Sequence, residues 1–210
     1  MLPLKDLAAF ALVCLAMVCT PGPNMIYLIS RSASQGRRAG LISLIGIALG
    51  FVIYMLSAVL GLTALMMAVP FLYEALRFAG VAYLLYLAWQ TVRPGGRSAF
   101  AVVRLSPDGP RRLFAMGLAT SLLNPKIAVL YLSLLPQFIR PELGSPLAHG
   151  LILGSTQIVV SVSINLLIVM SAGSIAASLA TRPGWQLGQR WITGTLLGAL
   201  AVRMATETRR

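Results

Sequence analysis

Residues 7–30 read LAAFALVCLAMVCTPGPNMIYLIS, and this uncharged stretch sets the architecture of the chain. A helix that spans a lipid bilayer needs about 20 predominantly apolar residues, which this stretch supplies. Pro21-Gly22-Pro23 forbids a regular helix near its middle, because proline lacks the amide N–H. At membrane depth the freed carbonyls must face protein or water rather than lipid. The stretch therefore predicts a broken membrane helix with a binding site at the break.

The composition extends this prediction to the whole chain. Of the 210 residues, 58% are apolar and 10% are charged, and the net charge is +12. The mean hydropathy is +0.84, whereas soluble domains are about 25% charged. The basic residues lie in short clusters between long apolar runs, so we expect contact with a lipid bilayer and no binding of nucleic acid. We predict an all-α integral membrane protein, with residues 1–210 as a single membrane domain.

The uncharged windows predict the spans and their symmetry. Six membrane helices are expected, at 7–30, 40–69, 74–92, 113–139, 147–179 and 185–204. A polar loop is expected at 31–38 and a basic linker at 93–112. The first repeat then covers about 1–92 and the second about 113–210. Each half has an odd number of spans, so the two halves are predicted to be inverted repeats.

A second proline break, Asn124-Pro125-Lys126, lies in the first helix of the second half. Paired breaks in inverted halves point to a transporter's substrate site. Lys126 is fourteen residues from both Arg112 and Arg140, or about 21 Å of helix, which is too far for its side chain to reach the membrane surface. Such a cation should face a cavity or a partner, and a substrate carboxylate would suit it. The alternative is a structural lysine in a bent, wetted helix.

Other polar and small residues follow helical spacing. In the fifth predicted helix, Gln157, Ser161 and Asn165 fall on one face with Gly154 and either line a cavity or bond neighbouring helices. The residues expected to bind substrate are Pro21, Gly22, Pro23, Asn24, Asn124, Pro125, Lys126, Gln157, Ser161 and Asn165. The glycines expected to serve helix packing are Gly46, Gly50, Gly61 and Gly80.

The sequence contains no pattern typical of catalysis. We find no carboxylate dyad, no nucleophile–base arrangement, no phosphate-binding loop and no metal-ligand cluster. We therefore expect no enzymatic activity, no metal and no cofactor. Cys14 and Cys19 project about 140° apart on a helix and cannot form a local disulfide.

The basic residues also predict the orientation. Ten lie in the loops after the first, third and fifth predicted helices, namely Arg31, Arg37, Arg38, Arg93, Arg97, Arg104, Arg111, Arg112, Arg182 and Arg190. Six lie on the other side, namely Lys5, Arg77, Arg140, Arg203, Arg209 and Arg210. This asymmetry places both termini in the periplasm.

An ordered set of motifs covers almost the whole chain: Pro21-Gly22-Pro23-Asn24, Gly46 and Gly50 with Gly61-Leu62, Gly80-Val-Ala-Tyr83-Leu84, Phe114 with Gly117, Asn124-Pro125-Lys126, and Pro136-Gln137-Phe138. This set resembles the LysE/RhtB family of bacterial amino-acid exporters. The resemblance implies a six-helix, multi-pass protein of the bacterial inner membrane. It also implies a secondary exporter, driven by the proton gradient, of amino acids or their derivatives.

Two positions depart from the family's pattern. Asn24 and, by approximate alignment, Ser161 stand where many members have an acidic residue. A carboxylate-bearing, amino-acid-like metabolite would suit a site whose one fixed charge is Lys126. The alternatives are a membrane thiol–disulfide electron carrier and a passive channel or scaffold. The sequence leaves the oligomeric state open, with a homodimer as one possible assembly.

Overall fold

Broken helices and long apolar helices build the computed structural model. It describes residues 2–20, 22–68, 106–171 and 183–206, together with residues 78, 79, 81, 82, 85, 86, 88–90, 92 and 93. The α-helices with described bounds are α1 (Leu4–Cys19), α2 (Pro23–Gln35), α3 (Arg37–Ala68), α5 (Pro110–Leu122), α6 (Pro125–Val129), α7 (Pro146–Ser171) and α9 (Pro183–Thr206). No strand occurs in these parts of the chain. The prediction of an all-α fold is confirmed for them.

Two of these helices are long and apolar enough to cross a membrane alone. They contain the segments Arg37–Gly61 and Pro146–Ser171, with mean hydropathies of 2.4 and 2.0. Two bent pairs also qualify if each pair counts as one span: α1 with α2, bent by 54°, and α5 with the segment 125–138, bent by 48°. The described residues thus hold two to four candidate spans.

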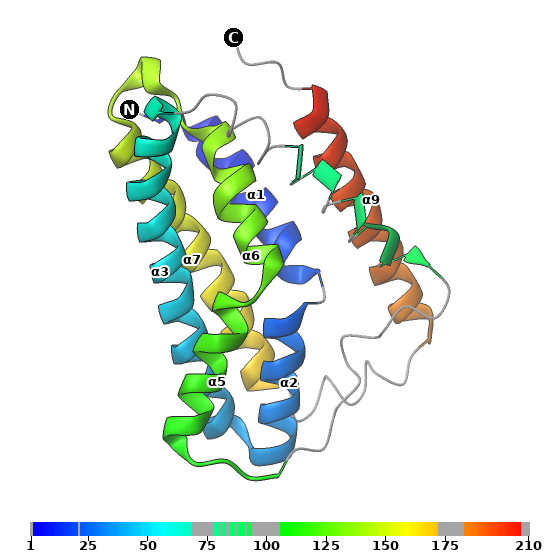
Figure 1. The fold of residues 1–210 in the computed structure, drawn as a ribbon. Helices are drawn as coiled ribbons and strands as arrows, with labels where there is room; N and C mark the ends of the chain where they lie inside the picture. The colour runs from blue at the N-terminus through cyan, green and yellow to red at the C-terminus, as the bar shows by residue number, and fades with distance from the viewer. Residues whose placement is uncertain are drawn as a thin grey trace.

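Both predicted breaks are present, each at its proline. Pro23 and Pro125 are first residues of α2 and α6, where a missing N–H is tolerated. After α6 the chain continues through a π-helical turn, η1 (Leu130–Leu134), and a 3₁₀ turn, η2 (Leu135–Phe138). A further 3₁₀ turn, η3 (Pro141–Leu143), leads to α7. The two bent segments run in opposite directions (Figure 1).

Three predicted boundaries are corrected. The polar loop at 31–38 is largely helix, because Arg31 is buried in an ion pair and does not end α2. The chain turns at Gly36, whose φ of 85° favours glycine, and α3 begins at Arg37. The helix expected from residue 113 begins at Pro110, so the basic linker ends earlier than predicted.

The core lies where the bent segments pack against α3 and α7 (Figure 1). Its fully buried side chains include Phe10, Phe51 and Tyr131. Helix α9 contacts α1 and lies against the segment around Ala88 and Val92. The predicted ends at Pro70, Glu74 and Leu179 lie outside the described residues.

Candidate functional site

The first break is held by a side chain from the second bent segment. The carbonyl of Met17 would normally accept from residue 21, which is a proline, and the carbonyl of Thr20 lies beyond the end of α1. Lys126 Nζ donates to both carbonyls, at 2.9 Å to Met17 and 2.7 Å to Thr20. The ammonium thus lies at the C-terminal end of α1, where the helix dipole favours a cation.

Lys126 reaches this place because Gly22 has no side chain. A Cβ on Gly22 would lie 2.9 Å from Nζ and 3.2 Å from Cε of Lys126. The φ of Gly22 is −158°, an extended conformation that any residue can adopt. Glycine is therefore needed here because it leaves space for the Lys126 side chain. Two of the three ammonium N–H bonds of Lys126 are used on the carbonyls, and one remains for a ligand.

The second break is compensated by local and distant groups. Asn124 precedes α6, and its Oδ1 accepts from the backbone N–H of Lys126 at 3.1 Å. That N–H would otherwise bond the carbonyl of Leu122. The carbonyl of Leu122 instead accepts from Tyr54 Oη of α3 at 2.7 Å.

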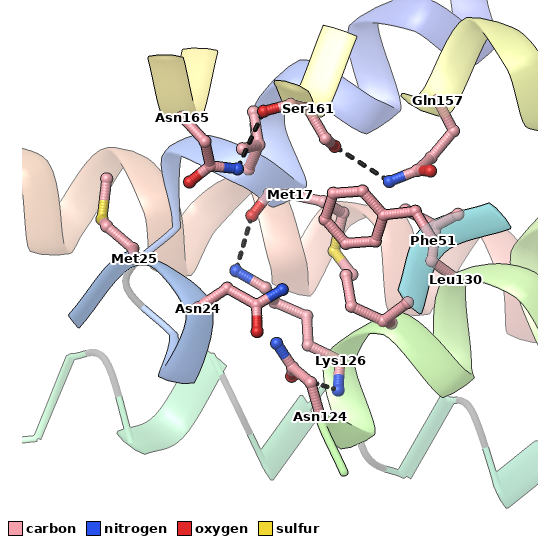
Figure 2. Close-up of a pocket in the computed structure, with 12 residues that line it drawn as sticks. Met17, Asn24, Met25, Phe51, Asn124, Lys126, Leu130, Gln157, Ser161 and Asn165 are labelled. Atoms are coloured by element: carbon pink, nitrogen blue, oxygen red, sulfur yellow. Dashed lines mark hydrogen bonds between the residues drawn. The ribbon is translucent and has the colours of Figure 1, made fainter. Parts of the chain in front are cut away.

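The polar face of α7 lies opposite these breaks. Gln157, Ser161 and Asn165 are all buried on α7. Gln157 Nε2 donates to Ser161 Oγ at 2.9 Å, and its Oε1 accepts from Tyr131 Oη at 2.5 Å. Asn165 Nδ2 donates to the carbonyl of Ser161 at 2.8 Å. The hydrogen bonds orient the amides toward the two breaks (Figure 2).

A small cavity lies between α7 and the two breaks (Figure 2). Its volume is about 20 Å³, room for about one water molecule. Its polar lining comes from Asn24, Asn124, Lys126, Gln157, Ser161 and Asn165, and its apolar lining from Met17, Val18, Met25, Phe51, Ile127 and Leu130. The lining side chains are buried, and the space between them is too small for an amino acid.

Three amides at this cavity have atoms without a hydrogen-bond partner among the described residues. Both Nδ2 and Oδ1 of Asn24, Nδ2 of Asn124 and Oδ1 of Asn165 are buried in this way. The exposed fractions of the three side chains are 6%, 0% and 2%. A buried polar atom without a partner costs about 1–3 kcal/mol. The cavity thus offers unused donors, unused acceptors and one buried ammonium.

The structure brings most of the predicted site residues together. Asn24, Asn124, Lys126, Gln157, Ser161 and Asn165 line the cavity, and Gly22 contacts Lys126. Pro23 and Pro125 begin the helices beside it. Pro21 lies outside the described residues. Their role in binding substrate stays a prediction at this point.

Sequence reasoning missed the tyrosines and the apolar half of the cavity. Tyr54 and Tyr131 stack with ring centroids 5.9 Å apart, and each hydroxyl bonds a group at the site. Met25 and Phe51 line the apolar side. In a chain this apolar, such residues give no signal that separates them from other core positions.

The glycines of α3 lie against α5. A Cβ on Gly46 would lie 2.2 Å from the Phe114 carbonyl oxygen, and one on Gly117 would lie 2.2 Å from that of Ser43. A Cβ on Gly50 would lie 2.6 Å from the side chain of Ser121. At Gly61 a Cβ would meet no described atom within 4 Å, and Gly80 lies outside the described residues.

Metal-binding and redox groups do not gather at this cavity. In the described ranges, no three His, Cys, Asp or Glu side chains lie close enough to hold a metal ion. Cys14 is buried in the core and Cys19 is exposed on α1. Neither residue lines the cavity.

Two broken helices that meet at a small polar cavity are typical of a multi-pass membrane transporter. The chain belongs to the LysE type translocator family, whose profile matches residues 15–208. An uncharacterized membrane protein of Pseudomonas aeruginosa is 28% identical over 214 residues, covering 99% of this chain and 98% of that protein. No solved structure matches the chain significantly.

Relatives with a named activity are also similar over most of their length. The leucine efflux protein of Salmonella typhimurium is 29% identical over 194 residues, covering 90% of each chain. The leucine efflux protein of Klebsiella pneumoniae is 25% identical over 197 residues, again covering 90% of each. The family to which the chain belongs is one of translocators.

Proposed function

We propose that this protein is a secondary exporter of amino acids or amino-acid-like carboxylates across the bacterial inner membrane. The leucine efflux proteins among its relatives support an amino-acid substrate. The observation that carries the proposal is the set of buried, unpartnered amide atoms around Lys126 in the cavity. A soluble ligand with complementary groups would recover the free energy that these atoms lose by burial.

The polar half of the cavity matches the head group of a zwitterionic amino acid. A carboxylate accepts from the free N–H of Lys126 and from Nδ2 of Asn24 and Asn124. An ammonium group donates to Oδ1 of Asn165 and of Asn24. The site thus binds both charged ends without a carboxylate among its described lining residues.

The apolar half of the cavity selects the side chain. Val18, Met25, Phe51, Ile127 and Leu130 face the same space. Apolar surface removed from water contributes about 25 cal/mol per Å², so an aliphatic substrate side chain binds there more favourably than a polar one. This half supports a leucine-like substrate over a charged one.

Substrate entry requires the cavity to widen, because it now holds only about one water molecule. The two breaks are the places where the bent segments can pivot, since backbone bonds are missing there. The role proposed for the predicted site residues follows from this position: Gly22, Pro23 and Pro125 shape the hinges while the amides and Lys126 contact the solute.

We further propose six spans in two inverted halves within one domain, 1–210, with both termini in the periplasm. The opposite directions of the two bent segments support the inversion (Figure 1). Arg31 is buried in an ion pair, which leaves nine arginines on the side assigned to the cytoplasm against six basic residues on the other side. The driving force proposed is the proton gradient.

Uptake by inside-out membrane vesicles tests the function. Vesicles from cells that express the protein should accumulate radiolabelled leucine above its external concentration when the proton gradient is present. A protonophore should abolish the accumulation, and unlabelled glutamate should compete poorly. Equilibration without accumulation would indicate a passive channel, and accumulation that resists the protonophore would contradict proton coupling. Vesicles from cells without the gene provide the background.

A further inference from the structure

Acidic side chains are scarce in this chain, with five against 17 lysines and arginines. Asp6, Asp108 and Glu142 are the acids that the structure describes, and each pairs with an arginine. Asp108 precedes α5, which begins at one end of the helix assembly, whereas Asp6 lies in the first turn of α1, which begins at the opposite end (Figure 1). Glu142 lies in η3 and contacts Arg140, the residue that pairs with Asp6. The cavity lies between these ends.

One ion pair closes the end formed by α2 and α5. Arg31, in the last part of α2, pairs with Asp108, two residues before α5 begins. The exposed fractions of the two side chains are 3% and 6%. Arg31 also donates to the Ser106 carbonyl at 3.1 Å, and Gln35 Nε2 donates to the Asp108 carbonyl at 3.0 Å. This pair joins the end of the first bent segment to the start of the second.

The other ion pair closes the end formed by α1 and η2. Asp6, in the first turn of α1, pairs with Arg140, two residues after η2, with 3.4 Å between Oδ2 and Nε. The exposed fractions are 16% for Asp6 and 46% for Arg140. Just inside, the rings of Phe10 and Phe138 meet edge to face, 5.1 Å apart. This pair joins the start of the first bent segment to the end of the second.

The two ion pairs are therefore related by the symmetry of the bent segments: exchanging the first segment with the second exchanges one pair with the other. Each segment has an aspartate at its start and an arginine at its end, and each aspartate binds the arginine of the other segment. The segments run in opposite directions, so the exchange also reverses the two ends of the molecule (Figure 1). Parting of the two segments at one end would give the cavity access to that side only.

We propose that Arg31–Asp108 and Asp6–Arg140 are the two gates of the transport cycle, one at each membrane face. This inference rests on the proposed transport function, since a gate has meaning only for a cavity that opens to both sides. The two gates differ in strength: breaking a buried pair is far more costly than breaking an exposed one. The Asp6–Arg140 gate is thus the one that opens more readily from this conformation.

Sided labelling of a cysteine in the cavity tests the gates. The reporter is Val18→Cys, placed on the cavity wall, in a Cys14→Ala/Cys19→Ala background. A membrane-impermeant methanethiosulfonate reagent is applied to right-side-out and to inside-out vesicles, and the rate of modification is measured. Asp108→Asn should raise the rate about tenfold from the Arg31–Asp108 face alone, and Asp6→Asn about tenfold from the opposite face alone.

The chain offers a matched control at each end. Arg112 pairs with the same Asp108 at 3.1 Å but is 71% exposed, and Glu142 pairs with the same Arg140 at 3.9 Å and is 62% exposed. Arg112→Gln and Glu142→Gln should leave both rates unchanged. Equal effects from both faces, or no effect in either variant, would overturn the proposal.

The labelling result can be separated from a loss of protein and from a failure of the proposed substrate. If Asp108→Asn lowers the membrane level, the Asp6→Asn variant still decides the question, because its ion pair is partly exposed and its loss costs less stability than that of the buried pair. Labelling needs no substrate, so sided rates with no leucine uptake would support the gates while contradicting the proposed substrate. Unchanged rates with normal uptake would contradict the gates alone.

Discussion

Lys126 has two roles that a single side chain can combine. Its ammonium binds two carbonyls at the first break, that of Thr20 and that of Met17, which also accepts from the Thr20 N–H. It faces the cavity from a position 7% exposed. From sequence these roles were alternatives, a carboxylate site or a structural lysine. The geometry supports both, because an ammonium has three N–H bonds and two carbonyls use only two.

Lys126→Met should therefore lose both functions. The Thr20 carbonyl loses its Lys126 donor, while the Met17 carbonyl keeps the Thr20 N–H at 3.2 Å. One buried carbonyl without a partner costs about 1–3 kcal/mol in the free energy of unfolding, partly offset because an uncharged residue is easier to place in a membrane. We expect a lower melting temperature in detergent and no leucine efflux from preloaded cells. Lys5→Met, the same change at an exposed position at the start of α1, should alter neither. Wild-type efflux by Lys126→Met would contradict a role for Lys126 in binding the substrate.

Replacing Asn24 should lower activity without lowering stability, unlike the replacement of Lys126. The amide of Asn24 is buried and has no hydrogen-bond partner among the described residues. Asn24→Leu, of similar size, removes the cost of burying that amide, about 1–3 kcal/mol, and should keep or raise the melting temperature. Leucine efflux should fall at least tenfold. Retained efflux at matched membrane levels would contradict a role for this amide in binding.

At the scale of elements, α3 and α5 lie close enough for backbone contact. Gly46 and Gly117 leave room for carbonyl oxygens of the facing helix, as small residues do in membrane helix pairs. This close packing places Tyr54 of α3 within reach of the carbonyl at the second break. The α3–α5 contact thus positions one wall of the cavity.

Gly46→Ala should separate the two helices. The added Cβ would lie 2.2 Å from a backbone oxygen, which no side-chain rotation can relieve. We expect a drop of several degrees in the melting temperature. Gly61→Ala, in the same helix with open space around it, should be neutral or slightly stabilising because alanine favours helix by about 0.5–1 kcal/mol. Equal melting temperatures for the two variants would contradict the contact.

At the scale of the whole molecule, the bent segments, α3 and α7 surround a small cavity, and an ion pair lies beyond it at either end. Both cysteines of the chain lie in α1, and the second bent segment contains none. A thiol–disulfide carrier that works across the two segments therefore has no pair of cysteines to use.

The double variant Cys14→Ala/Cys19→Ala should export leucine at close to the wild-type rate. Cys14 is a buried core residue, so a small loss of stability is expected from the lost sulfur atom. The measurement is efflux from preloaded cells at matched membrane levels. Loss of efflux in a correctly inserted variant would revive the redox function.

Much of the site was visible in the order of residues. Proline lacks the backbone N–H in any surroundings, so Pro23 and Pro125 predict helix breaks from the sequence alone. A lysine among apolar residues needs a polar partner, so Lys126 predicts either a polar cavity or a set of carbonyls that its ammonium binds. The helical spacing of Gln157, Ser161 and Asn165 likewise defines one face of α7 without further information.

The partners of these groups depended on tertiary structure. That Lys126 bonds the carbonyls of Met17 and Thr20, more than a hundred positions away, follows from the packing of two bent segments and from no local pattern. The same holds for Arg31, which the sequence placed in a loop and the fold buries against Asp108. Local rules act through the backbone of neighbouring residues, whereas ion pairs and cavity walls arise only when distant segments meet.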